Sequence, residues 1–120
     1  MGSALNKRVL GDTQEHFVID YLLSQDYDIV ERNFRCRLGE IDIIARNEGY
    51  LVFVEVKYRK NMAYGHPSMA VNRRKQQTIY KVAEVYYKKN GISMNTPSRF
   101  DVVSVLGDNV EIIKNAFGGL

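Results

Sequence analysis

The sequence has few of the features that mark secreted and membrane proteins. Its 120 residues include one cysteine, Cys36, which excludes an intrachain disulfide and suits a reducing compartment. The longest uninterrupted apolar run, residues 51–54, is far shorter than the roughly 20 residues of a membrane-spanning helix. Residues 1–8 lack the apolar core of a signal peptide. These absences predict a cytoplasmic protein with no membrane partner.

Motifs of two large enzyme classes are also missing. The chain has no glycine-rich phosphate loop and no G-x-S-x-G nucleophile elbow. It contains no internal repeat, linker or low-complexity segment, and a chain of this length can form a core without disulfides or a structural metal. We therefore expect a single domain over residues 1–120, with residues 1–10 flexible.

Positive charge is concentrated in one part of the chain. Residues 57–89 hold nine Lys or Arg and one acid, Glu84, for a net charge of +8, whereas the remainder has eight basic and 13 acidic residues and a net charge of −5. A basic block in a small domain suggests a polyanionic partner such as nucleic acid. From charge alone, a solvated helix face explains the block equally well.

Hydrophobic periodicity predicts an α/β protein with its elements in the order αβββαββ. Asp12 is expected to cap a first helix that ends near Ser24, with Glu15 in capping-box spacing. Asn72 is expected to cap a second helix that ends near Lys89. The other elements are expected as strands at 29–34, 40–46, 50–58, 100–106 and 110–114, a polar loop at 59–67 and a turn at 68–71.

Acidic side chains occur within the two clearest strands. If residues 48–49 form a two-residue hairpin loop, Asp42 faces Glu55, and Lys57 lies on the same face opposite Glu40. A three-residue loop would change this register. Because both strands are otherwise apolar, the carboxylates are expected to be buried, where they need a cation. A Mg²⁺ ion held by oxygen ligands and a structural network with Lys or Arg explain the pattern equally well.

Glu15 is a third candidate ligand. It shares a helical stripe with Val18, Ile19 and Leu22, so its side chain is expected on the face that packs against the sheet, directed towards the strand carboxylates. The alternative role of Glu15 is that of a capping-box glutamate alone.

Other chemistry-bearing residues give weaker indications. His16 and His66 lack the spacing of metal ligands, and Cys36 has no local partner that would make it a nucleophile. Tyr58 and Tyr64 adjoin basic residues and could stack on a nucleic-acid base.

Taken together, these motifs resemble a known family. Asp42, separated by 12 residues from Glu55-Val56-Lys57, resembles the signature of the PD-(D/E)xK nuclease superfamily, with Ile41 where that superfamily has proline. Over residues 11–117 the chain resembles more specifically the small bacterial YraN family, related to archaeal Holliday-junction resolvases. The resemblance lies in GDxxE at 11–15, RNFR at 32–35, GEIDIIA at 39–45, FVEVKYR at 53–59, Lys75 and RFDVV at 99–103.

The resemblance implies a restriction-endonuclease-like mixed β-sheet flanked by helices and a Mg²⁺- or Mn²⁺-dependent endonuclease acting on DNA, with branched DNA and RNA as further substrates to consider. It assigns Asp42, Glu55 and the Val56 carbonyl to the metal. Glu15 is implied as the helical acid that binds or orients a second metal or a metal-bound water, and Lys57 as the residue that positions the attacking water. Contacts to the phosphate backbone are expected from Arg59, Lys60, Arg73, Arg74 and Lys75.

The alternative function is a non-catalytic nucleic-acid-binding or partner-docking module that keeps the nuclease fold. All four polar residues of the signature are present, and a retired site has no reason to keep such costly groups. The sequence leaves open whether the chain acts as a monomer or a homodimer, and what Asp101 and His66 do.

Overall fold

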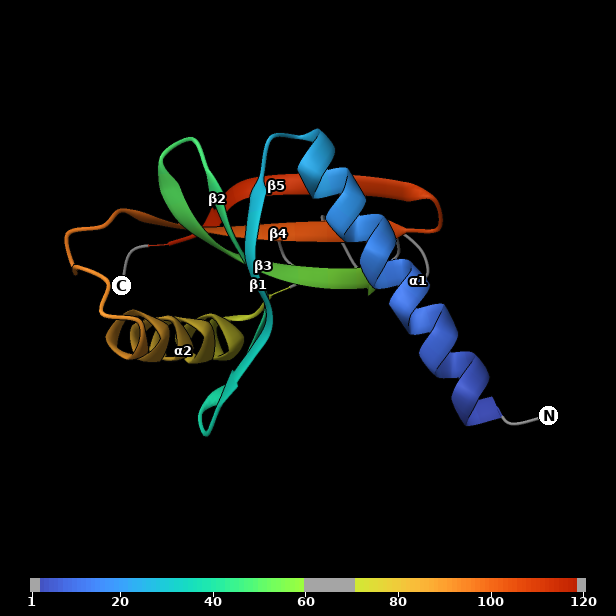
Figure 1. Cartoon of the computed structure of the whole chain (residues 1–120), viewed down its shortest axis with the longest axis horizontal. Helices are drawn as coiled ribbons and strands as arrows, with labels where there is room; N and C mark the ends of the chain where they lie inside the picture. Colours follow the sequence, from blue (N-terminus) through green and yellow to red (C-terminus); the bar gives the residue numbers. More distant parts are fainter. Residues whose placement is uncertain (1–2, 60–70, 119–120) are drawn as a thin grey trace.

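The computed structural model describes residues 3–59 and 71–118, and these form two helices and five strands. The predicted αβββαββ order is confirmed (Figure 1). The predicted loop and turn lie outside the described residues, except that Arg59 ends a strand and Val71 precedes a helix. The elements are α1 (Ser3–Ser24), β1 (Asp28–Cys36), β2 (Gly39–Asn47), β3 (Tyr50–Arg59), α2 (Arg73–Lys89), β4 (Ser98–Leu106) and β5 (Asn109–Phe117).

The strands form one mixed sheet in the order β1-β2-β3-β4-β5, which confirms the predicted fold class. Neighbouring strands are antiparallel except β3 and β4, which run parallel from Leu51↔Ser98 to Arg59↔Leu106. The chain between these parallel strands includes α2, as a parallel crossover requires. The central position of β3 explains why its sequence is apolar on both faces.

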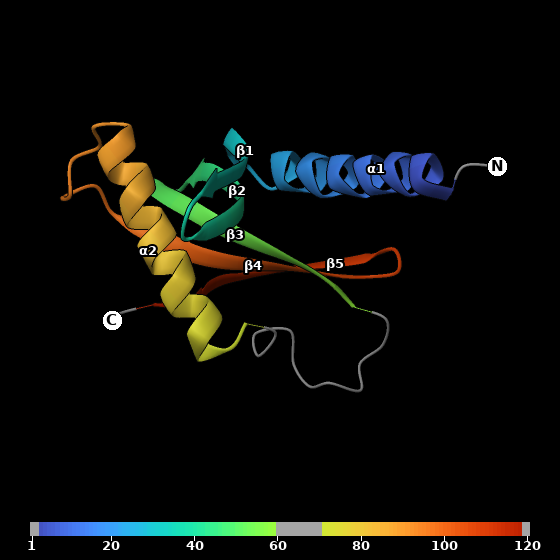
Figure 2. The ribbon, with the colours of Figure 1, turned by 90° about the horizontal axis from the view of Figure 1, so that it is seen from below.

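The two helices cover opposite faces of the sheet (Figure 2). On the α1 face, the buried side chains are Val18, Leu22, Tyr27, Ile43, Ala45, Val52, Val54, Val103 and Val105. On the α2 face, an aromatic cluster surrounds Phe53, whose ring lies 5.5 Å from that of Phe100 and 6.0 Å from that of Tyr86. Residues 51–55 of β3 are therefore buried, and Glu55 is the one charged side chain among them.

The start of the first helix differs from the prediction. We expected Asp12 to cap it, but α1 begins at Ser3, so Asp12 lies inside the helix and Glu15 is not in its first turn. Residues 3–10 are mostly good helix formers, and a single internal glycine at position 11 costs about 1 kcal/mol, which a helix tolerates. The N-terminal turns of α1 run past the end of the sheet (Figures 1 and 2).

The second helix starts where the sequence predicts. Asn72 is its N-cap, and the Asn72 side chain accepts a hydrogen bond of 2.9 Å from the Lys75 amide. Neither helix in the described ranges combines the length and apolar character needed to cross a membrane.

Candidate functional site

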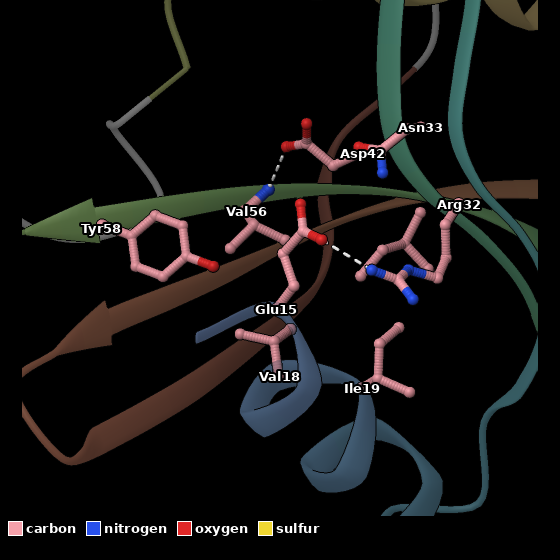
Figure 3. Close-up of a pocket in the computed structure, with 9 residues that line it drawn as sticks. Glu15, Val18, Ile19, Arg32, Asn33, Asp42, Val56 and Tyr58 are labelled. Atoms are coloured by element: carbon pink, nitrogen blue, oxygen red, sulfur yellow. Dashed lines mark hydrogen bonds and ion pairs between the residues drawn. The ribbon is translucent and has the colours of Figure 1, made fainter. Parts of the chain in front are cut away.

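The polar residues of the central strands gather where β2 and β3 separate. The register between these strands runs from Asn47↔Tyr50 to Ile43↔Val54, as the predicted two-residue loop requires. One residue further on, Asp42 Oδ2 accepts a hydrogen bond of 2.8 Å from the Val56 amide (Figure 3). Because β2 remains paired with β1 as far as the hairpin turn, Asp42 lies in a fork between two strands.

The β1–β2 ribbon turns over at this fork. Arg32 and Ile43, which pair with each other, lie on the α1 face, whereas the next pair, Phe34 and Ile41, lies in the cluster beneath α2. Residues two apart in a regular strand stay on one face, so the ribbon rotates between these pairs. Asn33, at φ 53°, lies in this stretch, and asparagine tolerates that conformation better than most residues. The rotation lets Asp42 reach groups on both faces.

Glu55 is the buried partner of Asp42. Its side chain is 9% exposed, and burial, a hydrogen bond with the Asp42 carboxylate and the charge of Asp42 raise the pKa of Glu55 to about 8. At neutral pH the pair therefore holds a proton between the two carboxyl groups. The predicted contact between Asp42 and Glu55 is present in the structure. The predicted position of Glu40 opposite Lys57 is not observed, because the β2–β3 pairing ends at Ile43↔Val54, and Glu40 instead forms an ion pair with Arg35 on β1.

Two lysines border the carboxylate pair. Lys57 follows Glu55 by two residues on β3, and Lys75 Nζ approaches Glu55 Oε2 to 3.9 Å from the first turn of α2. Both positive charges oppose the rise in the pKa of Glu55. The structure thus places Lys75, which we expected among the backbone-contacting residues, beside the carboxylates themselves.

Glu15 lies on the other side of β3, in a pocket of about 110 Å³ that Asp42 and Tyr58 also line (Figure 3). Its Oε2 accepts a hydrogen bond of 2.6 Å from Arg32 Nη2. Glu55 alternates with Val54 and Val56, which pack on the α1 side, and so faces α2. The structure brings Glu15 near Asp42 but does not bring it together with Glu55.

The carboxylate pair fits one hard divalent cation. Carboxylate and carbonyl oxygens are the ligands that Mg²⁺ prefers, and it commonly binds one or two carboxylates plus water and substrate phosphate. A cation bound to both carboxylates would favour their ionised forms, which burial and mutual repulsion disfavour in the metal-free pair. In the part of the chain that the structure describes, no group of three His, Cys, Asp or Glu side chains is close enough to hold a metal. The pair therefore fits a cation that keeps open positions.

The other predicted contact residues are dispersed around the fork. Arg73 and Arg74 are exposed on the first turn of α2, and Arg59 lies half-buried at the end of β3. Lys60, His66 and Tyr64 lie outside the described residues.

Sequence reasoning missed the roles of two residues that line the pocket beside Glu15. Arg32 forms the ion pair with Glu15, and Tyr58 forms part of the pocket lining. Burial and the charges of Glu15 and Asp42 raise the pKa of Tyr58, so its phenol lies within electrostatic reach of both carboxylates. Alternation along β3 places Tyr58 on the face of Val54 and Val56, and this signal could have found it.

A second buried polar cluster accounts for Asp101. This fully buried carboxylate accepts hydrogen bonds from the Tyr27 hydroxyl at 2.7 Å, from the Arg99 guanidinium at 2.9 Å and from the Asn115 amide at 2.9 Å. Arg99 also donates to Asn47 at 2.7 Å, which in turn donates to the Asp26 carbonyl at the α1–β1 junction. The cluster ties three strands, β2, β4 and β5, to this junction, and both oxygens of the Asp101 carboxylate have partners.

These features define an α/β protein with a pair of carboxylates at a strand fork, one of them the buried Glu55, and a lysine from β3 and another from α2 beside them. The chain matches the uncharacterised protein family UPF0102 over residues 14–105, and it belongs to this family, the YraN-like family that the sequence motifs predict. A UPF0102 protein of Lachnoclostridium phytofermentans is 51% identical over 94% of this chain and 96% of its own. A UPF0102 protein of Clostridium botulinum is 46% identical over 90% of this chain and 93% of its own.

Proposed function

We propose that this protein is a metal-dependent endonuclease that hydrolyses phosphodiester bonds in DNA. The observation that carries the proposal is the contact between Asp42 and the buried Glu55 in the strand fork, with Lys57 and Lys75 beside it. Asp42 and Glu55 contact each other directly, whereas a structural network would place a lysine between them. Two carboxylates forced together in a sheet are costly unless a further cation joins them.

The spacing of the residues supports the reaction class. Asp42 on one strand and Glu55-x-Lys57 on the next resemble the PD-(D/E)xK signature, and the structure brings the three positions to one end of the β2–β3 pairing. The mixed sheet flanked by helices is the architecture that this superfamily implies.

Asp42, Glu55 and the Val56 carbonyl would hold Mg²⁺ or Mn²⁺, which would lower the pKa of a bound water and offset charge on the scissile phosphate. Asp42 is fixed for this role by the Val56 amide, which occupies one carboxylate oxygen and leaves the other available. Lys57 would orient the attacking water and stabilise the charge that develops on the phosphate oxygens. Glu15 would act from the α1 side of Asp42 on a second metal or its water, after exchanging its bond with Arg32.

The basic side chains around the fork would bind the DNA backbone. Arg73 and Arg74 extend from the exposed first turn of α2, next to Lys75. Cations placed there would contact phosphates independently of base sequence. DNA is thus expected to approach from the N-terminal end of α2, with one phosphate at the carboxylate pair.

The test is cleavage of linear, single-stranded, flap and four-way DNA by the full chain with Mg²⁺, with Mn²⁺ and with EDTA. Asp42→Asn keeps an oxygen for the Val56 amide and removes the charge, so it should retain the fold and lose metal-dependent cleavage. Glu111→Gln, the same exchange at an exposed position on β5, is the matched control and should cleave as the wild type does. Tight binding without cleavage of any DNA or RNA, with either metal, would contradict the proposal and favour the binding module.

A further inference from the structure

The pocket beside Glu15 has an unbalanced set of charges. Among the described residues that line it, Glu15 and Asp42 are acids, Arg32 is a base, and the others are neutral. With both carboxylates ionised, the pocket therefore has one more negative charge than positive. Its volume of about 110 Å³ leaves room for a small ligand beside these groups.

Arg32 is bound to Glu15 through a small part of its hydrogen-bonding capacity. Its Nη2 donates to Glu15 Oε2 at 2.6 Å, and in the described part of the chain this is the one hydrogen bond of the Arg32 side chain. A guanidinium has five N–H donors in a planar fork that matches the oxygens of a phosphate. The other oxygen of Glu15 points away from Arg32 (Figure 3).

The ion pair between Arg32 and Glu15 can exchange at low cost. The two side chains are 39% and 41% exposed, and ion pairs at such exposure add little to stability. The backbone of Arg32, by contrast, is fixed, because it pairs with Ile43, the residue after Asp42, just before the ribbon turns over at Asn33. The guanidinium can therefore change its partner and remain beside Asp42.

We propose that Arg32 is a phosphate-binding residue that Glu15 retains until a divalent cation enters the pocket, so that cation binding and DNA binding are coupled. This inference rests on the proposed nuclease function and concerns the regulation of its site. Glu15 turns from Arg32 to the cation, and the released guanidinium donates two N–H groups to a backbone phosphate.

The charges of the pocket explain the coupling. Without a cation, a phosphate beside Arg32 would also lie near Glu15 and Asp42, and Glu15 already neutralises the guanidinium. A divalent cation changes the formal charge of the pocket from −1 to +1, and a phosphate then finds a net positive site. Arg32 therefore binds DNA at the carboxylates only when the cation that hydrolysis requires is also present.

The first experiment measures the affinity of the full chain for a linear DNA duplex in EDTA and in Ca²⁺, by fluorescence anisotropy. Ca²⁺ takes carboxylate oxygens as ligands, as Mg²⁺ does, and a gel checks that the DNA stays intact. The wild type is expected to bind about tenfold more tightly with Ca²⁺. Arg32→Gln should keep the affinity in EDTA and reduce the Ca²⁺-dependent increase about three- to tenfold.

Two further variants separate this role from charge in general. Arg35→Gln is the matched control, because Arg35 lies on the same strand and its ion pair with Glu40 is outside the pocket. It should keep the full Ca²⁺-dependent increase. Arg32→Lys keeps the charge and can still pair with Glu15, but it lacks the fork and should keep only part of the increase.

The second experiment measures the melting temperature without DNA. Ca²⁺ should raise the melting temperature of Arg32→Gln at least as much as that of the wild type, because no arginine then competes for Glu15. A smaller increase in Arg32→Gln would show that Arg32 supports the cation site rather than competing with it, and would contradict the proposal.

Three results of the binding experiment would overturn the proposal. If Ca²⁺ leaves the DNA affinity of the wild type unchanged, there is no coupling. If Arg32→Gln weakens binding equally in EDTA and in Ca²⁺, Arg32 is a permanent DNA contact, and if it changes neither affinity, the ion pair only joins α1 to β1. All three leave the nuclease proposal standing, because that proposal depends on metal-dependent cleavage and its loss in Asp42→Asn. If the wild type cleaves nothing but loses its Ca²⁺-dependent increase in Arg32→Gln, the nuclease proposal fails and the coupling is confirmed.

Discussion

The Asp42 carboxylate takes over the hydrogen bond of the Val56 amide, at 2.8 Å, where strand pairing between β2 and β3 ends. The Asp42 side chain thus accepts the hydrogen bond that a backbone carbonyl would accept between paired strands. The strands can therefore separate without leaving the Val56 N–H unsatisfied. The same bond fixes the Asp42 carboxylate beside Glu55, so the geometry of the candidate metal site is set by the way in which the fork is closed.

Asp42→Asn should separate the structural role of this residue from metal binding. The amide oxygen still accepts from Val56, and removing the negative charge lowers the pKa of Glu55. The metal-free free energy of unfolding should therefore stay equal or rise, while the increase in melting temperature with Mg²⁺ or Mn²⁺ should disappear. Thermal melts across a metal titration measure both quantities. If Asp42→Asn keeps the full metal-induced increase, the metal binds elsewhere.

Stability without metal should fall as the pH rises. The pKa of Glu55 is about 8 in the folded protein, against an ordinary value of 4.5. Between these values the folded state binds the proton and the unfolded state does not, so the free energy of unfolding decreases by up to about 1.4 kcal/mol per pH unit. Urea unfolding of the wild type and of Glu55→Gln, in EDTA from pH 5 to 8, measures how much of the pH dependence of the free energy of unfolding comes from Glu55. Equal slopes in the two proteins would show that Glu55 is ionised at neutral pH.

The strands and α2 could be predicted because their local signals agree with their tertiary surroundings. Residues 40–46 and 50–58 are rich in β-branched residues, and the two-residue loop between them sets the register that places Asp42 near Glu55. Asn72 caps α2 as predicted, because its side chain can accept from the Lys75 amide.

The remaining features depend on contacts between distant segments. The turnover of the ribbon at Asn33 cannot be predicted from alternation, because it exchanges the faces of residues two apart. Glu15 meets Arg32 because α1 and β1 come together only in the folded chain. Asp101 could not be assigned for the same reason, since its partners Tyr27 and Asn115 come from the α1–β1 junction and from β5.

The Asp101 cluster should be required for stability and not for chemistry. Asp101→Asn leaves Arg99 with only the exposed Glu48, 3.3 Å away, as a counter-charge, and breaking a buried pair costs about 3–5 kcal/mol. Tyr27→Phe removes one hydrogen bond to a charged group and should cost about 1–3 kcal/mol. Urea unfolding measures both. Asp101→Asn should melt at a lower temperature than the wild type, but Mg²⁺ or Mn²⁺ should still raise its melting temperature. A selective loss of that increase would place Asp101 in the metal site.

Contact between the ribbon and α2 should be sensitive to one methyl group. Gly39→Ala puts a Cβ 2.9 Å from Thr78 Cγ2, and such overpacking costs about 1–3 kcal/mol. Thr78→Ser removes that methyl and keeps the hydroxyl that bonds the Arg74 carbonyl. The double variant should therefore recover part of the stability that Gly39→Ala loses. Additive losses in a double-mutant cycle would show that the two residues do not touch in solution.

Lys57 and the arginines of α2 should affect different steps of the reaction. Arg73→Ala/Arg74→Ala removes two exposed cations from the first turn of α2, so it should weaken DNA binding across all sequences and reduce the slope of log affinity against log salt by about 1.8. Lys57→Ala changes a residue beside the carboxylate pair, so binding should change little while cleavage falls about 100-fold or more. Fluorescence anisotropy in EDTA and single-turnover cleavage with Mg²⁺ measure the two steps separately. If Lys57→Ala loses binding and the α2 variant loses only cleavage, the roles of the two basic groups are reversed.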